Sequence, residues 1–114
     1  MLYPFPKEES FDGYILSGPE FLVLSEDIIM SNGNIIYPDN SIWVEADDQI
    51  SKLFYDNAYK LEDSNNYGVS SVLKIKFEGR YYKNGNYGHL GKYNSMVKIN
   101  KVLDYSNKIP GLNI

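Results

Sequence analysis

Residues 73–80 alternate between apolar or small side chains and charged ones. Leu73, Ile75, Phe77 and Gly79 form the first set, and Lys74, Lys76, Glu78 and Arg80 form the second. Because successive side chains of a strand point to opposite faces, this pattern predicts a strand with one buried and one solvated face. Gly79 has no side chain on the buried face, which indicates a bend or another backbone close by. A second alternating segment, 97–103, predicts a further strand with residues 97, 99, 101 and 103 on one face.

Three more strands and one helix are predicted upstream. Apolar runs at 11–17 and 20–25 predict two strands, separated by Gly18-Pro19. Runs at 34–37 and 41–46 predict the third strand, which is broken at Pro38-Asp39-Asn40. Asn32-Gly33 is typical of a tight hairpin turn. Asp47-Asp48 can cap a helix. One apolar helical face then follows, made of Ile50, Leu53, Phe54, Ala58 and Leu61.

The element order, three strands, a helix and two strands, predicts the fold class. It is an α+β fold, mainly β: a five-stranded OB-like barrel with one helix between strands 3 and 4. An open α+β sheet with the same elements is the alternative. The domain organisation that we expect is an extended arm over residues 1–10, a single barrel domain over 11–106 and a tail over 107–114.

Composition limits the chemistry available. There is no cysteine and a single histidine, so we expect no disulfide, no metal site, no cofactor and no catalytic residue. No apolar run is long enough for a signal peptide or a membrane span, so we expect a cytoplasmic protein. Residues 1–63 contain 13 acidic and 3 basic residues, whereas residues 64–114 contain 2 acidic and 8 basic ones. This asymmetry indicates a charged partner, unless the two halves neutralise each other in one barrel.

The segment 78–93, between the last two predicted strands, is rich in special residues. It holds four glycines, four tyrosines, three cations and the histidine. Gly79-Arg80-Tyr81 and Gly88-His89-Leu90-Gly91-Lys92-Tyr93 resemble a segment, G-R-aromatic … G-H-L-G-x-Y, of small uncharacterised bacterial OB-like proteins, some of them lipoproteins. The resemblance covers roughly residues 72–103 and implies a fold but no activity. Since this chain lacks cysteine, it does not imply a lipid anchor here.

Within this segment we expect a loop at about residues 83–94. Gly88 and Gly91 are expected to flank a tight turn, because glycine tolerates positive φ. His89 is interpreted first as a residue that caps loop carbonyls. A ligand contact and an acid–base role are the alternatives, and no motif supplies a partner for the latter. The candidate ligand-binding residues are Arg80, Tyr82, Tyr87, His89 and Tyr93.

Two functions remain open from the sequence. The first is a non-enzymatic interaction protein, for example an immunity-type protein that neutralises a basic partner. The candidate partner-binding residues are then Asp12, Glu20, Glu26, Asp27, Tyr37, Asp47 and Asp48, with Trp43 as a further anchor, although Trp43 fits the core better. The alternative is an OB-type module that binds nucleic acid or an anionic ligand through the loop between the last two strands. A pI near 4.9 disfavours nucleic acid.

Overall fold

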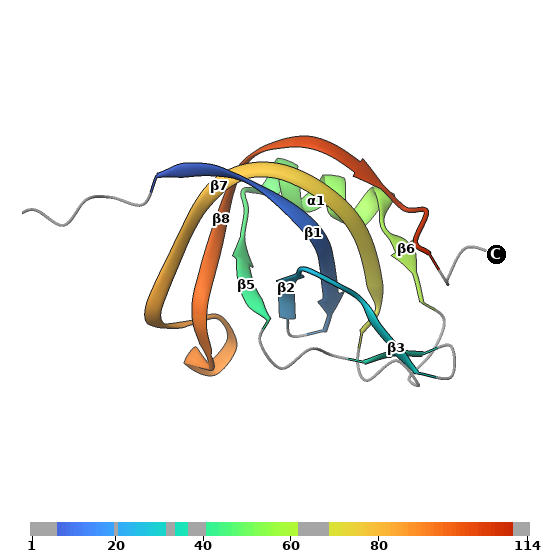
Figure 1. Cartoon of the computed structure of the whole chain (residues 1–114), viewed down its shortest axis with the longest axis horizontal. Helices are drawn as coiled ribbons and strands as arrows, with labels where there is room; N and C mark the ends of the chain where they lie inside the picture. The colour runs from blue at the N-terminus through green and yellow to red at the C-terminus, as the bar shows by residue number, and fades with distance from the viewer. Residues whose placement is uncertain (1–6, 20, 32–33, 37–40, 62–68, 111–114) are drawn as a thin grey trace, which may run out of the picture.

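The computed structural model describes residues 7–19, 21–31, 34–36, 41–61 and 69–110. The chain forms eight strands, one α-helix and one short 3₁₀-helix within these ranges (Figure 1). The elements are β1 (Glu8–Gly18), β2 (Phe21–Ser25), β3 (Ile29–Ser31), β4 (Asn34–Ile36), β5 (Ile42–Glu45), α1 (Asp48–Asn57), β6 (Tyr59–Lys60), β7 (Ser71–Tyr87), η2 (His89–Gly91) and β8 (Tyr93–Ser106). Strand β1 begins at Glu8, so the last residues of the expected N-terminal arm belong to the sheet.

Five of the strands form a closed ring in the order β1, β2, β5, β8 and β7, and β7 pairs back onto β1. Strands β5 and β8 run parallel, and the other four pairs of the ring are antiparallel. In chain order the five strands are β1, β2, β5, β7 and β8, and the helix lies between the third and the fourth of them. This order is that of an OB-like fold, so the predicted fold class is confirmed. The long β1–β7 ladder, from Glu8–Arg80 to Ser17–Ser71, rules out the open sheet.

Helix α1 begins where the sequence predicts and ends earlier. The Asp47 carboxylate accepts a hydrogen bond from the backbone N–H of Ile50 at 2.9 Å, which satisfies one exposed donor of the first turn. Phe54 is the buried residue of the helix. Ala58 already has extended backbone and serves as the C-cap, and Leu61 lies beyond β6. The predicted continuation of the helical face to Leu61 is therefore wrong, because residues 59–60 pair with β7 instead.

The barrel interior is the main hydrophobic core. Ile15, Leu24, Phe77 and Val97 from four strands pack there, and Phe54 of α1 joins them. A second cluster lies on the outer side of the ring, where Leu16, Val23 and Val72 pack under Ile35 of β4 and Ile109. Ile109 is 1% exposed, so part of the expected C-terminal tail packs against the domain. Both faces of β1 are therefore buried along part of its length, at Ile15 on one side and Leu16 on the other.

The β7–β8 ladder confirms the first alternating pattern and corrects the second. Phe77 is fully buried and its ring stacks on Phe11 with centroids 5.2 Å apart. A Cβ at Gly79 would lie 2.4 Å from the carbonyl oxygen of Lys98, so the predicted backbone approach is confirmed.

On β8 the expected face holds only as far as Ile99. Register shifts opposite residues 76–79 put Val102, rather than residues 101 and 103, against the core. Leu103 is 41% exposed. A bulge that adds a residue reverses which side chains face inward, and this is the reason for the difference.

Candidate functional site

The β7–β8 pair continues past the ring as a two-stranded hairpin (Figure 1, lower left). The loop expected at 83–94 is mostly strand, because β7 runs to Tyr87, β8 starts at Tyr93 and these two residues pair. Asn84, at φ 60°, and a register shift between Lys83 and Tyr87 accommodate the irregular part of the ladder. Only the tip of the segment is therefore a turn.

The tip has the tight geometry expected for Gly88 and Gly91. Their φ angles are 73° and 64°, and the N–H of Gly91 donates to the carbonyl of Gly88 at 3.0 Å. Leu90 also has positive φ, at 58°, and its side chain is 74% exposed. The turn thus presents an apolar side chain to solvent at the end of the hairpin.

The tip folds back onto Trp43 of β5. A Cβ at Gly88 would lie 2.4 Å from Cδ2 and Cε3 of the indole, so the glycine backbone rests directly on the ring. The Tyr93 ring packs on the same indole, with centroids 5.1 Å apart and planes at 45°. The indole Nε1–H donates to Oε1 of Glu45 at 3.0 Å. Trp43 is partly buried on the outer side of the ring, where it packs against the second hydrophobic cluster, so it lies at the edge of that cluster and not in the barrel interior.

Trp43 belongs to an apolar row that crosses the outer side of the sheet. Its register partners are Val23 on β2 and Met96 on β8, and Met96 in turn pairs with Tyr82 on β7. Register partners lie on the same face of a sheet, so these four side chains are neighbours. Val23 is fully buried under the outer cluster, whereas Met96 and Tyr82 stay partly exposed.

The hairpin face is our name for the partly exposed residues of this row together with Tyr93, whose ring packs on Trp43. It consists of Trp43, Tyr82, Tyr93 and Met96. Sequence reasoning missed Met96. The only signal that could have found it was the polar–apolar alternation of β8, which gives Met96 no special status.

The five candidate ligand-binding residues are spread along the hairpin. Tyr82 and Tyr93 belong to the hairpin face, and the ring of Tyr87 lies against Gly85. Arg80 lies opposite Lys98 in the β7–β8 ladder, whereas His89 lies at the tip. Arg80 and Tyr87 are seven positions apart along β7, about 23 Å at 3.3 Å per residue of strand. The structure therefore does not gather the five around one ligand at the barrel mouth.

The His89 side chain is exposed. The backbone carbonyl of His89 accepts a hydrogen bond from the backbone N–H of Lys92, at 3.4 Å, within the turn. The capping of loop carbonyls by the His89 side chain stays a prediction.

Charges of both signs border the hairpin face. The row next to it places Glu8, Arg80, Lys98 and Glu45 on neighbouring strands in that order. Lys92 is exposed just after the tip. Lys83 is also exposed, but it directly follows Tyr82 in β7, so its side chain points to the face opposite to that of Tyr82. The basic half of the sequence therefore contributes cations here, and two carboxylates partly offset them.

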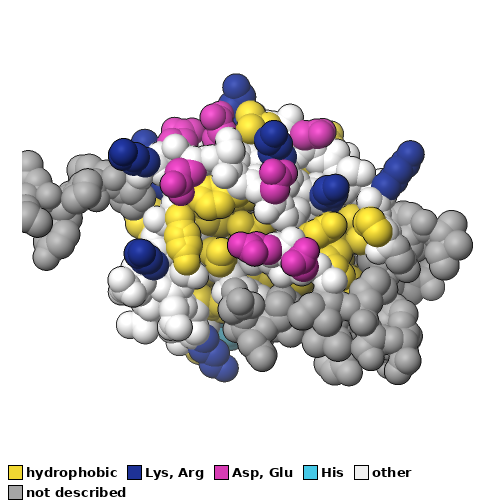
Figure 2. Space-filling view, viewed as in Figure 1, with side chains coloured by type: hydrophobic (Ala, Val, Ile, Leu, Met, Phe, Trp, Pro, Cys, Tyr) yellow, Lys and Arg dark blue, Asp and Glu magenta, His cyan; other side chains and the backbone are white. Residues whose placement is uncertain are grey.

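The candidate partner-binding acids fall into two groups. Asp12, Glu26 and Asp27 are exposed near the end of β2. Asp47 and Asp48 are exposed after the end of β5, which is antiparallel to β2, so the two groups lie at opposite ends of these strands. In one view of the molecule, acidic side chains border a hydrophobic centre (Figure 2). The remaining two candidates, Glu20 and Tyr37, lie outside the described residues.

Within the ranges that the structure describes, no three His, Asp or Glu side chains lie close enough to share a metal ion. In the same ranges, no helix has the length and apolar character needed to cross a membrane. Comparison with known proteins found no matching family model, no matching curated protein and no matching solved structure. The resemblance of the glycine- and tyrosine-rich segment to small bacterial proteins thus stays a prediction.

Proposed function

We propose that this chain is a non-enzymatic binding protein that engages another protein through the hairpin face. The observation that supports this most is the apolar row itself. Trp, Tyr and Met are among the side chains that are enriched in protein interfaces. Here they occupy neighbouring strand positions and remain partly open to solvent.

The hairpin face is also held in place before any partner arrives. Trp43 is fixed by its hydrogen bond to Glu45, by the Tyr93 ring and by the backbone of Gly88. A side chain that is already ordered loses less conformational entropy on binding, so more of the contact energy appears as affinity. The exposed Leu90 at the tip adds an apolar contact at the edge of the same surface.

The partner that we propose is basic, as for an immunity-type protein that neutralises its target. The chain has a net charge of −4, and residues 1–63 carry most of the acids. Since charges of both signs border the hairpin face, its affinity would rest on aromatic contacts. The exposed acids Asp12, Glu26 and Asp27 would act at a distance, by steering a basic partner and raising the association rate.

Site-specific photo-crosslinking tests this function. The photoreactive p-benzoylphenylalanine is placed at position 82 on the hairpin face or, as a matched control, at exposed position 101 on β8. We expect irradiation in the native cell to give one discrete crosslinked protein from position 82 and none from position 101. Crosslinks of equal yield from both positions, or from 101 alone, would contradict the proposal.

A second candidate is single-stranded nucleic acid. The observation that favours it is the pairing of cations with aromatic rings, since Arg80 and Lys98 lie one row from Tyr82 and Trp43 on the outer side of OB-like strands. Fluorescence anisotropy with labelled dT and rU oligonucleotides at several salt concentrations distinguishes the two. Micromolar or tighter binding that weakens steeply with salt would favour nucleic acid over a protein partner.

A further inference from the structure

A concave site that shares no residue with the hairpin face lies elsewhere on the domain. It is a pocket of about 460 Å³ between the C-terminal half of α1, the β1–β2 turn and the start of β7. This volume falls in the range of small-molecule sites in proteins. None of the residues of the hairpin face lines the pocket, so it is independent of the proposed protein interface.

The walls of the pocket are mainly apolar. Phe21 and Leu22 of β2, Phe54 and Ala58 at the end of α1, and Leu73 of β7 line it. Phe54 and Leu73 are also part of the barrel core, so this wall is rigid and largely preformed. Such a wall fits a hydrocarbon chain or ring and contributes affinity by removing apolar surface from water.

Serine hydroxyls add a few fixed polar groups. Ser17 and Ser71 lie side by side on paired strands and share a hydrogen bond between their hydroxyls. Ser51 of α1 and Ser70 also line the pocket. A small number of placed polar groups within an apolar wall is the usual composition of a ligand site.

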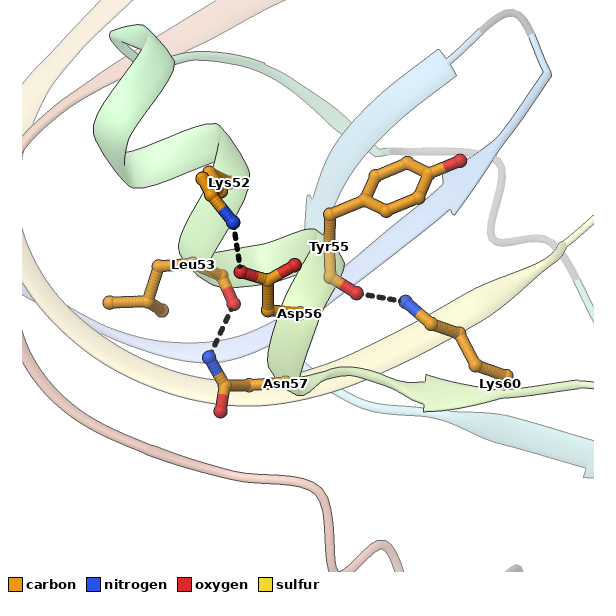
Figure 3. Close-up of polar contacts among 6 residues, drawn as sticks. All are labelled: Lys52, Leu53, Tyr55, Asp56, Asn57 and Lys60. Carbon is orange, nitrogen blue, oxygen red and sulfur yellow. Dashed lines mark hydrogen bonds and ion pairs between the residues drawn. The ribbon is translucent and has the colours of Figure 1, made fainter.

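The described lining holds one charged side chain, the cation Lys60, and no carboxylate. The Lys60 ammonium donates to the backbone carbonyl of Tyr55 and lies 4.7 Å from the centroid of the Tyr55 ring (Figure 3). These two contacts place the cation beside the C-terminal end of α1. An ammonium has three N–H donors, so the bond to Tyr55 leaves donors for an anionic ligand group.

We propose that this pocket binds a small amphipathic carboxylate of the medium-chain fatty acid class. Its apolar chain lies between Leu22, Phe54 and Leu73, and its carboxylate meets Lys60. The match rests on the apolar walls, on the volume and on the single positive charge among the described lining residues.

Titration with sodium decanoate, followed by two-dimensional ¹H–¹⁵N NMR on the full chain, tests the proposal, with decan-1-ol as the uncharged probe of equal chain length. We expect saturable binding of decanoate that shifts the amides of Ala58, Ser70 and Ser71. Lys60→Met keeps the length of the side chain and removes its charge. It should weaken decanoate binding at least fivefold and leave decanol binding unchanged.

Two further comparisons complete the test. Lys52→Met is the matched control, because Lys52 is exposed on the nearby helix α1, pairs with Asp56 and does not line the pocket (Figure 3). It should bind decanoate as the unaltered chain does. Ala58→Phe fills the pocket and should weaken both probes at least tenfold. If it does not fold, Ser70→Phe at the exposed edge serves the same purpose.

Three results would overturn the proposal. They are the absence of saturable binding, shifts confined to the hairpin, and equal decanoate affinity in Lys60→Met and Lys52→Met.

Discussion

Replacing Gly88 by alanine should disrupt the hairpin face, because the added methyl group would clash with the Trp43 ring. Gly88 has φ 73° and ψ −160°, a region that is essentially restricted to glycine and costs other residues about 1–3 kcal/mol. The new Cβ would also lie 2.4 Å from two carbons of the Trp43 ring and 2.8 Å from Cδ2 of Tyr93. Overpacking of this kind typically costs about 1–3 kcal/mol more. We therefore expect Gly88→Ala to lower the free energy of unfolding by roughly 3 kcal/mol.

Gly91→Ala is the matched control within the same turn. Gly91 also has positive φ, at 64°, but a Cβ there would meet only Cβ of Asn86, at an ordinary 3.4 Å. Its cost is then backbone strain alone, about 1–2 kcal/mol. The difference between the two variants reports the contact with Trp43 together with the more restricted backbone of Gly88.

Urea denaturation and tryptophan fluorescence give the two measurements. Trp43 is the only tryptophan of the chain, so emission reports on this surface directly. Before unfolding, Gly88→Ala should shift the emission maximum, because the ring must move away from Gly88 and Tyr93. Gly91→Ala should leave the maximum unchanged. Equal losses of stability and identical spectra in the two variants would refute the packing of the turn on Trp43.

Four further substitutions test the fold by urea denaturation. Phe77→Ala removes a fully buried ring and should lower the free energy of unfolding by roughly 3–5 kcal/mol. Lys76→Ala, at the exposed neighbouring position, should lower it by less than about 0.5 kcal/mol. Equal effects would contradict the assignment of Phe77 to the inner face and Lys76 to the outer face. Gly79→Ala should cost at least about 2 kcal/mol, because its Cβ would force β7 away from the Lys98 carbonyl, and a near-neutral result would mean that the strands are not so close. Asp47→Ala should cost about 1 kcal/mol through loss of the helix cap, and an unchanged midpoint would show that the cap contributes nothing.

Local patterns in the sequence predicted the features that depend on neighbouring residues. The alternation around Phe77, the cap at Asp47 and the positive φ of Gly88 each follow from side-chain chemistry within a few positions. The order of the elements then sufficed for the OB-like ring, because few topologies accommodate a helix between the third and fourth of five strands.

Features that depend on distant pairing were not predictable in this way. Ala58 and Leu61 have helical spacing, yet pairing of residues 59–60 with β7 ends the helix before them. Trp43 has apolar neighbours on both sides in sequence, and its outer position is set by its pairing with Val23 and Met96. The pocket is another such feature, since its walls come from three separate segments of the chain.

The most direct test of the hairpin face is a calorimetric measurement of affinity. The partner identified by crosslinking is purified, and its affinity is measured for two variants of this chain. Tyr82→Ala truncates a partly exposed ring of the face, and Lys101→Ala truncates an exposed side chain elsewhere on β8. Thermal unfolding first establishes that both variants are folded. We expect Tyr82→Ala to weaken binding about 30-fold, corresponding to a contact of about 2 kcal/mol, and Lys101→Ala to leave the affinity unchanged. Equal affinities for the two folded variants would place the recognition surface outside the hairpin face.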